Sequence, residues 1–466
     1  MKPLRDQPSA DAPPSQGRWL FAIVLAGAVT LGAIVALLGA QGVAAIVLAA
    51  LVALGAALSL PTLLVVVVSS LLLPLDYMDA FMDSVRGIPA VVIVSILLAL
   101  SLYTRRKFLE ITPLTRSLGV FIALMAISAV ATFDITGGIR SVALWGAGLA
   151  ASAAFVAAAR EDGRLQWRLV WLLLALSAAA AATVFVDRLF GVAVWDLIPG
   201  YQPVLKTLGG DWVRPSASLG QPLRLGTLNM LGCISGLALI FANKSRAVAA
   251  LCVLLSASSL FLTAARGSWL GLVIAIAVMV LLTSTAVRKR VLVVLGVATA
   301  VGLTLGAVTG ALPLAWDRLT GASFDPSSFA QRFSAIDIAS DMIRRRPLFG
   351  YGFSEYAKAV VDAGLPVPSL ENDYIGFALK GGLPVLVAFL LMIVTAIRPA
   401  LGRCQEPIVL AFLALLAALA VNAATYNMFD WTSMPTIFSL VLAGLWSSLG
   451  SPAAVPSVSR SGTRRL

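Results

Sequence analysis

The chain has 466 residues, of which 59% are hydrophobic and only 12% are charged. A water-soluble protein carries about 25% charged residues, so this composition excludes a soluble fold and indicates a polytopic membrane protein. The formal net charge of +12 does not require nucleic acid as a partner, because Lys and Arg collect in the cytoplasmic loops of membrane proteins.

The residue types that are scarce or missing narrow the chemistry. The chain has no histidine, which removes the usual base near neutral pH, the commonest metal ligand and every Ser-His or Cys-His nucleophile system. Its three cysteines show no spacing typical of a disulfide framework or a metal site. Any chemistry must therefore use carboxylates, arginines, hydroxyls or the backbone, and we expect neither a metal nor a cofactor.

Apolar runs of about 20 residues, the length needed to cross a membrane, follow one another along most of the chain. We expect spans at 19–40, 43–60, 61–75, 88–103, 115–132, 141–159, 167–187, 225–242, 247–265, 267–284, 290–312, 373–397, 406–425 and 434–450. The second and third are poorly separated, so the predicted number is about 12 to 14. The predicted fold is an all-α polytopic membrane protein, with one transmembrane domain over 19–450 between disordered tails at 1–18 and 451–466.

The distribution of basic residues predicts the topology. With both tails in the cytoplasm, basic loops such as 160–168, 244–246 and 398–403 also lie on that side, as the positive-inside rule requires. Two long loops, 188–224 and 313–372, then lie on the outer face. Long loops escape the rule, so it permits their arginines without explaining them.

Three arginines around the first outer loop are candidate phosphate ligands. Arg214 and Arg224 flank the turn PSASLGQP before the next span, and Arg266 lies between two apolar runs at the outer boundary. The planar guanidinium can bind two phosphate oxygens at once. The alternatives are solvated loop arginines at 214 and 224 and, at 266, a side chain that snorkels to the interface.

The second outer loop contains an expected amphipathic helix that carries Arg332 and lies on the membrane surface or caps a cavity. We place Phe329, Phe333, Ile336 and Ser340 on one face of this helix, flanked by Ala335, Ile338 and Met342. The basic run 344–346 then precedes Pro347, which ends the helix. Gly350 and Gly352 allow a tight turn after it.

Acidic and basic residues meet at the start of the run 373–397. Asp373 suits an N-cap role, which leaves Glu371 freer to act as a base. Lys380, followed by two glycines, places a cation and a break inside the run. Such a charge usually faces a cavity or a partner, and the sequence does not identify the partner of Lys380.

The stretches AARGSWLGL, RFSAIDIASDMIRRRPLFGYGFSEY and ENDYIGFALKGGLPVLV occur in this order along the chain. Their order and spacing resemble the O-antigen ligase and O-antigen polymerase superfamily of bacterial envelope proteins. The segment RPSASLGQPLRLG is similar to a loosened form of another family segment, an Arg followed by Gly and an Asn-Pro or Gln-Pro pair. The resemblance covers about 210–395 in motif and the whole chain in hydropathy.

The resemblance implies a membrane glycosyltransferase of the bacterial cytoplasmic (inner) membrane, using a glycan on undecaprenyl pyrophosphate at the outer face. Arg214 and Arg266 fall where the family places the arginines that hold the donor pyrophosphate. Family ligases have a His-Asn pair, and Glu371 stands at the histidine position here, which favours a polymerase over a ligase. The residues that we assign to substrate binding are Arg332, Asn372, Arg224, Gly350 and Gly352.

These assignments give an expected mechanism, a single-step, metal-independent and inverting transfer. Glu371 takes the proton of the acceptor hydroxyl while Arg214 and Arg266 stabilise the leaving pyrophosphate. The expected partners are the lipid-linked donor, a glycan acceptor, the bilayer and polysaccharide-assembly proteins. Three alternatives stay open: ligase-type transfer to a lipid or protein acceptor, a member that binds without turnover, and a transporter of small solutes or lipids.

Overall fold

The structure, a computed structural model, describes residues 112–190, 214–283, 326–364, 371–431 and 433–450, together with positions 296, 300 and 304. Within these residues all regular secondary structure is helical and no strand occurs. Several predicted segments lie outside the described residues. They are the spans 19–40, 43–60, 61–75 and 88–103, most of the span 290–312, and both predicted tails.

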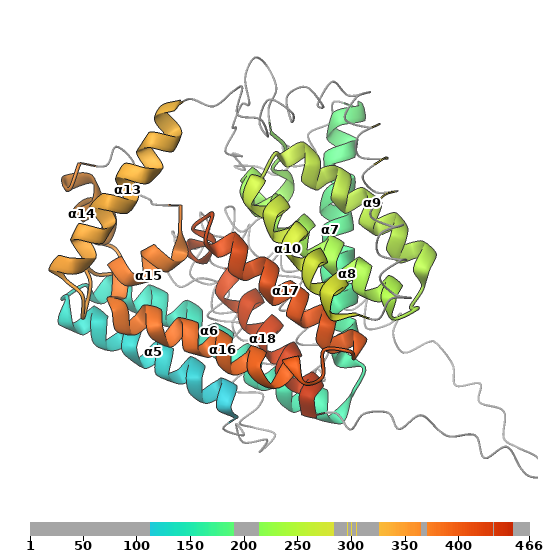
Figure 1. Ribbon diagram of the computed structural model, residues 1–466, viewed down its shortest axis with the longest axis horizontal. Coiled ribbons are helices and arrows are strands. Elements are labelled where there is room, and N and C mark those ends of the chain that lie inside the picture. The colour runs from blue at the N-terminus through green and yellow to red at the C-terminus, as the bar shows by residue number, and fades with distance from the viewer. Residues whose placement is uncertain are drawn as a thin grey trace, which may run out of the picture.

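Nine apolar helices form the body of the described part (Figure 1). They are α5 (Pro113–Ala131), α6 (Ile135–Glu161), α7 (Leu165–Phe190), α8 (Pro222–Phe241), α9 (Arg246–Thr263), α10 (Arg266–Leu282), α16 (Leu383–Leu401), α17 (Pro407–Ala423) and α18 (Met434–Gly450). Six of them are long and apolar enough to cross a membrane, namely α5, α6, α7, α8, α9 and α16. The prediction of an all-α polytopic membrane protein is confirmed.

The starts of these helices follow from local sequence. Thr112 and Thr115 form a capping box at α5, whose first residue is Pro113. Asp134 caps α6 by accepting a hydrogen bond from the Gly137 amide at 3.1 Å. A proline also stands in the first turn of α8, α16 and α17, where its missing N–H costs nothing.

An aromatic cluster fills the core between α5, α6, α16 and α18. Its members are Phe121, Trp145, Phe377, Phe389, Phe429 and Phe438. The Phe429 ring lies 5.1 Å from those of Trp145 and Phe438, in an edge-on arrangement with the latter. Phe429 belongs to the short helix η3 (Met428–Asp430) between α17 and α18, so the core fixes this turn in place.

The helices alternate in direction, which separates their connections into two ends. At one end, Gln405 Nε2 donates to the Leu282 carbonyl at 2.9 Å, Arg403 donates to the Leu449 carbonyl, and Lys244 lies over the Trp167 ring. The described segments predicted to be cytoplasmic are thus gathered at this end. The connections after α5, α9 and α17 lie at the opposite end, here called the outer end, whose orientation in the cell stays a prediction.

The predicted span 373–397 is interrupted at the two glycines where the sequence placed a break. It consists of α15 (Asp373–Gly381) and α16, and Gly382 between them has φ 82° and ψ 173°. Glycine tolerates this backbone, and a side chain there would collide with the Leu348 carbonyl. The Leu383 amide donates to the Pro347 carbonyl at 2.8 Å instead of continuing α15.

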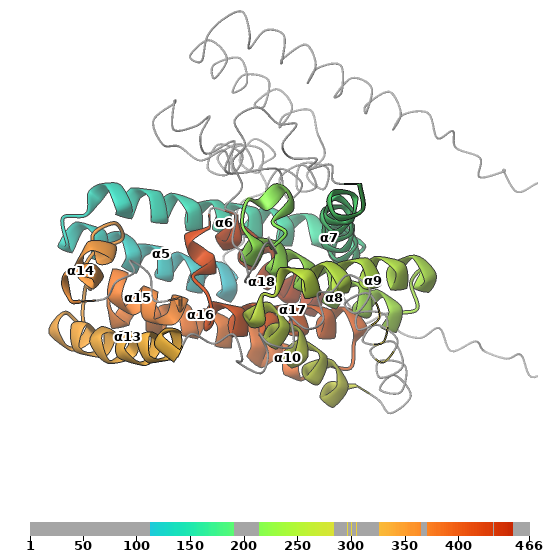
Figure 2. The same ribbon diagram turned by 90° about the horizontal axis from the view of Figure 1, so that it is seen from above.

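Two further helices, α13 (Pro326–Arg345) and α14 (Tyr356–Asp362), lie with α15 at the outer end, as Figures 1 and 2 both show. The predicted amphipathic helix is present as α13, but its faces were assigned wrongly. Ala335, Ala339 and Met342 are buried against Leu379, whereas Ile336 is 46% exposed. The residues predicted to flank the apolar face of α13 are therefore the ones that pack against α15. The side chains of Phe329 and Phe333 lie outside the described residues.

Candidate active site

Two of the predicted phosphate-binding arginines share one turn at the outer end. The buried Arg214 donates from Nε to the carbonyl of Thr263, the last residue of α9, at 2.7 Å. Ala264 then takes a left-handed conformation with φ 49°, and α10 begins at Arg266. The turn held by Arg214 therefore also sets the position from which Arg266 projects.

Close backbone contacts bring this turn against two other helices. A Cβ added at Gly226 of α8 would lie 2.6 Å from the Ala265 Cβ, and one added at Gly267 would collide with the Thr425 side chain. Small residues of this kind allow membrane helices to approach closely. Below them, Asn422 Nδ2 donates to Thr227 Oγ1 at 2.8 Å. The start of α8, the α9–α10 turn and the end of α17 thus form one packed unit.

Arg224, in the first turn of α8, faces the connection between α17 and α18. Its guanidinium carbon lies 5.3 Å from the centre of the Trp431 ring, a cation–π arrangement. Beside it, Tyr426 donates its hydroxyl to Gln221 Oε1 at 2.8 Å. Burial raises the pKa of Tyr426 to about 12, against the opposing effect of the nearby Arg224 charge. Tyr426 therefore stays a neutral hydrogen-bond donor at neutral pH.

The same connection is tied to the start of α15. Asn372 is the N-cap of α15, with Oδ1 accepting from the Tyr374 amide at 3.0 Å. The expected N-cap role of Asp373 is therefore wrong. The buried Asp373 carboxylate instead accepts from the amide of Met428 at 2.8 Å and from that of Phe429 at 3.3 Å. Its oxygens thereby satisfy two backbone donors of η3.

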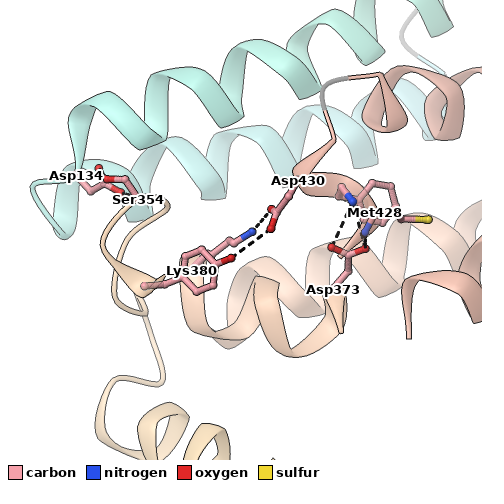
Figure 3. Close-up of polar contacts among 8 residues, drawn as sticks. Asp134, Ser354, Asp373, Lys380, Met428 and Asp430 are labelled. Atoms are coloured by element: carbon pink, nitrogen blue, oxygen red, sulfur yellow. Dashed lines mark hydrogen bonds and ion pairs between the residues drawn. The ribbon is translucent and has the colours of Figure 1, made fainter. Parts of the chain in front are cut away.

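Lys380 finds its partner on this turn, as Figure 3 shows. Its ammonium group forms an ion pair with Asp430 and lies 4.5 Å from the centre of the Tyr356 ring. Tyr356 donates its hydroxyl to Asp430 Oδ2 at 3.2 Å. Burial raises the pKa of Tyr356 to about 12, an effect that the Lys380 charge opposes. The Lys380 side chain is 11% exposed and that of Asp430 43%, so the acid is the partner that reaches the surface.

Two adjacent residues of the connection between α17 and α18 therefore contact basic side chains from two other helices. Lys380 contacts Asp430 and Arg224 contacts Trp431, the next residue. Arginines that can bind an anion and a surface carboxylate are thus positioned by neighbouring turns of the same end. This combination suits the transfer of a group away from a phosphate.

Residues 250–390 match a family model described as O-antigen ligase. The chain carries an O-antigen ligase domain. The resemblance found in the sequence is confirmed over this segment, whose family members are enzymes that act on glycans. No curated protein matches the chain. The protein is therefore an integral membrane protein with a segment similar to O-antigen ligases.

The O-antigen ligase segment contains only part of the candidate site. Arg266, α13, the turn after α13, Glu371 and Lys380 lie within the match, whereas Arg214, Arg224 and Asp430 lie outside it. Arg214 contacts the matched segment at Thr263 and Asp430 contacts it at Lys380, while Arg224 lies over Trp431, the residue after Asp430. Segments on both sides of the matched domain thus complete the site.

The two glycines of the Pro-x-x-Gly-x-Gly turn in the O-antigen ligase segment pack against the protein itself. The amides of Tyr351 and Gly352 donate to the carbonyls of Leu379 and Lys380, at 2.7 and 3.1 Å. Gly350 has φ 67°, and a side chain there would collide with the Leu379 carbonyl. This turn therefore supports the end of α15 and the position of Lys380. Its glycines are explained without a substrate contact, and their predicted role in substrate binding stays a prediction.

The remaining predicted residues lie near the start of α15 and on α13. Glu371 is partly buried and has φ 47°, a strained conformation for a residue other than glycine. Such outliers are frequent at functional sites, so this backbone is compatible with the proposed base. The backbone of Arg332 belongs to α13, and its side chain lies outside the described residues.

Sequence reasoning missed Asp430, Trp431 and Tyr356. One signal could have identified Asp430: a lysine inside an apolar segment needs an anionic partner, and Asp430 is the only acid between the predicted spans 406–425 and 434–450. Trp431 and Tyr356 have no comparable signal, since single aromatic residues are common at membrane interfaces.

Proposed function

We propose that the protein is a membrane glycosyltransferase that polymerises glycan units carried on undecaprenyl pyrophosphate. The observation behind this proposal is the shared turn of Arg214 and Arg266, in contact with the packed unit that carries Arg224. A pyrophosphate has several oxygens at fixed spacing, and arginine forks bind such oxygens in pairs. The O-antigen ligase match supports the glycan as the transferred group.

In this proposal the reaction is one displacement at the anomeric carbon. An acceptor hydroxyl attacks that carbon, a new glycosidic bond forms, and the bond to the pyrophosphate oxygen breaks. The lipid pyrophosphate leaves with the electron pair, and Arg214 and Arg266 stabilise its developing charge. Attack opposite the leaving group inverts the anomeric centre. The arginines thereby supply the charge stabilisation without a metal.

The proton of the acceptor hydroxyl goes to a carboxylate, for which we propose Glu371. It lies next to the cap of α15 and two residues before Asp373, which contacts η3. Asp430 is the rival base, because its side chain reaches the surface. Its oxygens are already engaged, one by the ion pair with Lys380 and the other by the hydroxyl of Tyr356, which supports Glu371.

The acceptor side is assigned to α13, with Arg332, and to Asn372, Gly350 and Gly352 at the edge of the site. We propose the outer face of the bacterial cytoplasmic membrane as the location, with both termini in the cytoplasm and polysaccharide-assembly proteins as partners. Ligase-type transfer to a lipid or protein acceptor is the second candidate, and the description of the matched family favours it. Glu371 in place of the ligase histidine favours polymerisation.

The test is Arg266→Ala in the purified protein, assayed with a glycan on undecaprenyl pyrophosphate. We expect kcat to fall by about 10²–10³-fold, the usual effect of removing one group that stabilises a developing oxyanion. The matched control is Arg246→Ala. Arg246 begins α9 just as Arg266 begins α10, but it lies at the opposite end of the bundle.

Arg246→Ala should retain wild-type turnover, and both variants should retain the wild-type melting temperature. Turnover of folded Arg266→Ala equal to that of the wild type would remove Arg266 from the pyrophosphate site. Analysis of the products separates the two candidate reactions, since a polymerase gives a ladder of lengths on the lipid carrier. A single transfer to another acceptor would instead support the ligase.

A further inference from the structure

The paired helices α5 and α16 present a broad apolar face to their surroundings. They pack side by side, with Phe121 of α5 against Phe389 of α16, and both figures show them together (Figures 1 and 2). Their outward side chains are exposed and apolar, namely Val120, Ile127, Val130, Leu383, Val387, Leu390, Leu391 and Val394. A face of this kind on a membrane helix contacts lipid acyl chains.

A hollow of about 490 Å³ lies at the outer end of this face, between the α5–α6 corner and the turn after α13. It is lined by Ala131, Thr132, Phe133, Arg346, Pro347, Leu348, Phe349 and Gly350. The hydroxyl of Ser128 donates to the Phe349 carbonyl at 2.7 Å, which fastens the turn to α5. Phe133 is 90% exposed. Apolar side chains at the rim thus continue the surface of α5 and α16.

Three exposed arginines stand beside the hollow. Arg344 and Arg345 end α13. Arg346 follows the helix and lines the hollow, with its guanidinium 4.9 Å from the centre of the Tyr351 ring. Arg344 has an exposed acidic neighbour, Asp341, at 3.5 Å. The surface therefore changes from hydrocarbon to concentrated positive charge over a short distance. Clusters of this kind beside a membrane helix attract anionic headgroups.

We propose that this hollow is a binding site for an anionic glycerophospholipid of the surrounding bilayer. The headgroup phosphate contacts Arg346 and its neighbours, and one acyl chain follows the apolar face of α5 and α16. A free anion would make no favourable contact with the apolar rim of Phe133, Leu348 and Phe349. A lipid without net charge would leave the positive charge of the three arginines unbalanced. The combination selects a ligand with both parts.

Occupancy of this site acts on the proposed active site through the backbone. The Pro347 carbonyl accepts from the Leu383 amide, and the Gly352 amide donates to the Lys380 carbonyl. A lipid that holds the turn 347–352 in place therefore also holds the break between α15 and α16. Lys380, which pairs with Asp430, stands at that break. Anionic lipid is expected to stabilise the protein even in the absence of any glycan substrate.

Binding is tested with full-length protein in detergent, titrated with short-chain phosphatidylglycerol or phosphatidylcholine and followed by native mass spectrometry and melting temperature. The wild type should bind phosphatidylglycerol in preference and melt at a higher temperature with it. Replacing Arg344, Arg345 and Arg346 by Gln should weaken that binding by about fivefold per arginine. The control removes three exposed arginines of the opposite end, Arg164→Gln, Arg246→Gln and Arg398→Gln, and should bind as the wild type does.

A second variant separates a site from diffuse surface charge. Ala131→Trp fills the hollow while all three arginines stay, and we expect it to lose the preference for phosphatidylglycerol. If Ala131→Trp still binds phosphatidylglycerol in preference to phosphatidylcholine, the proposed site is wrong. It is also wrong if the two triple-arginine variants lose phosphatidylglycerol binding to the same extent. Glycerol 3-phosphate should give no melting shift, and a shift as large as that of phosphatidylglycerol would indicate an anion site alone. Stronger binding of undecaprenyl phosphate than of phosphatidylglycerol would also contradict the assignment.

Discussion

The two sides of the outer end are built differently. On the first, at α8 and the α9–α10 turn, arginine side chains are buried or half-buried and contact a carbonyl or an aromatic ring. On the second, at α13 and the turn 347–352, the arginines are exposed, and the order comes from backbone hydrogen bonds to α15 and Leu383. The first side positions charged side chains, and the second positions a segment of backbone.

This contrast suggests different roles in one reaction. A charge that must meet a developing pyrophosphate is effective when it is fixed beforehand, as on the first side. The second side holds α15, from which Lys380 reaches Asp430 and near which Glu371 and Asn372 stand. Replacing Arg266 on the first side should therefore change the rate at constant stability. Those on the second should change stability and, through it, the site.

The largest effect is expected where the two sides meet, at the proposed base. Glu371→Gln removes a proton acceptor and keeps the size of the side chain, so kcat should fall by about 10²–10⁴-fold. Asp430→Asn should lower kcat less and lower the melting temperature, because it breaks the ion pair with Lys380. Turnover and thermal unfolding of both variants decide between them. A larger loss of kcat in Asp430→Asn, at unchanged melting temperature, would give the base role to Asp430.

The next effect tests the backbone role of the turn after α13. Gly350→Ala should destabilise the protein by roughly 2–4 kcal/mol, because of its left-handed backbone and the collision with the Leu379 carbonyl. Gly364→Ala is the matched control: Gly364 has φ 100°, and a Cβ there would meet nothing within 4 Å. Gly364→Ala introduces backbone strain without a collision, so it should lower the stability of the protein less than Gly350→Ala does. If the two variants unfold at the same temperature, the turn does not press on α15 as described.

The ion pair between Lys380 and Asp430 should have a smaller effect. Lys380→Met leaves Asp430 without its cation, and the expected loss is about 1–3 kcal/mol, reduced because the acid is 43% exposed. The double variant Lys380→Met with Asp430→Asn should recover part of that loss. A cycle of the two single variants and the double variant, followed by thermal unfolding, measures the coupling. Strictly additive losses would mean that the pair contributes nothing as a pair.

The sequence carried much of this architecture because membrane helices are encoded by long apolar runs. The predicted starts of α5, α8, α9, α10 and α17 lie within three residues of the structure. In the run 373–397 the two glycines after Lys380 indicated a break, but only the contacts of Gly382 show that the backbone changes direction there. Hydropathy reports which residues avoid water, not where the backbone changes direction.

The site was less accessible from sequence for a related reason. Arg266 was identified because arginine is unusual at an apolar boundary, and Arg214 because it flanks a turn in an outer loop just before a span. Asp430 and Trp431 were not, since their importance comes from contacts with Lys380 and Arg224, which lie far away along the chain. The same limitation applies to α13, where periodicity identified the helix but not the face that packs on α15.

The smallest expected effect concerns Asp134, which fastens the second side to the α5–α6 corner. Its carboxylate accepts from the Ser354 amide at 2.6 Å and from the Ser354 hydroxyl at 2.5 Å. Burial alone would raise the pKa of Asp134, but these hydrogen bonds, with that from Gly137, hold it below the ordinary value of 3.8. The stabilisation is therefore complete above about pH 5 and is lost as the pH falls through the lowered pKa.

Asp134→Asn should cost about 1 kcal/mol at pH 7, because the amide replaces a charged acceptor. The gap in melting temperature between variant and wild type should stay constant from pH 7 to about pH 5 and close in stronger acid. Asp341→Asn is the control, since Asp341 is exposed and lies beside Arg344. It should show no such dependence. A gap that widens with acid would mean that the Ser354 contact stabilises the protonated form of Asp134. That result would contradict the contact shown in Figure 3, in which the Ser354 amide donates to the Asp134 carboxylate.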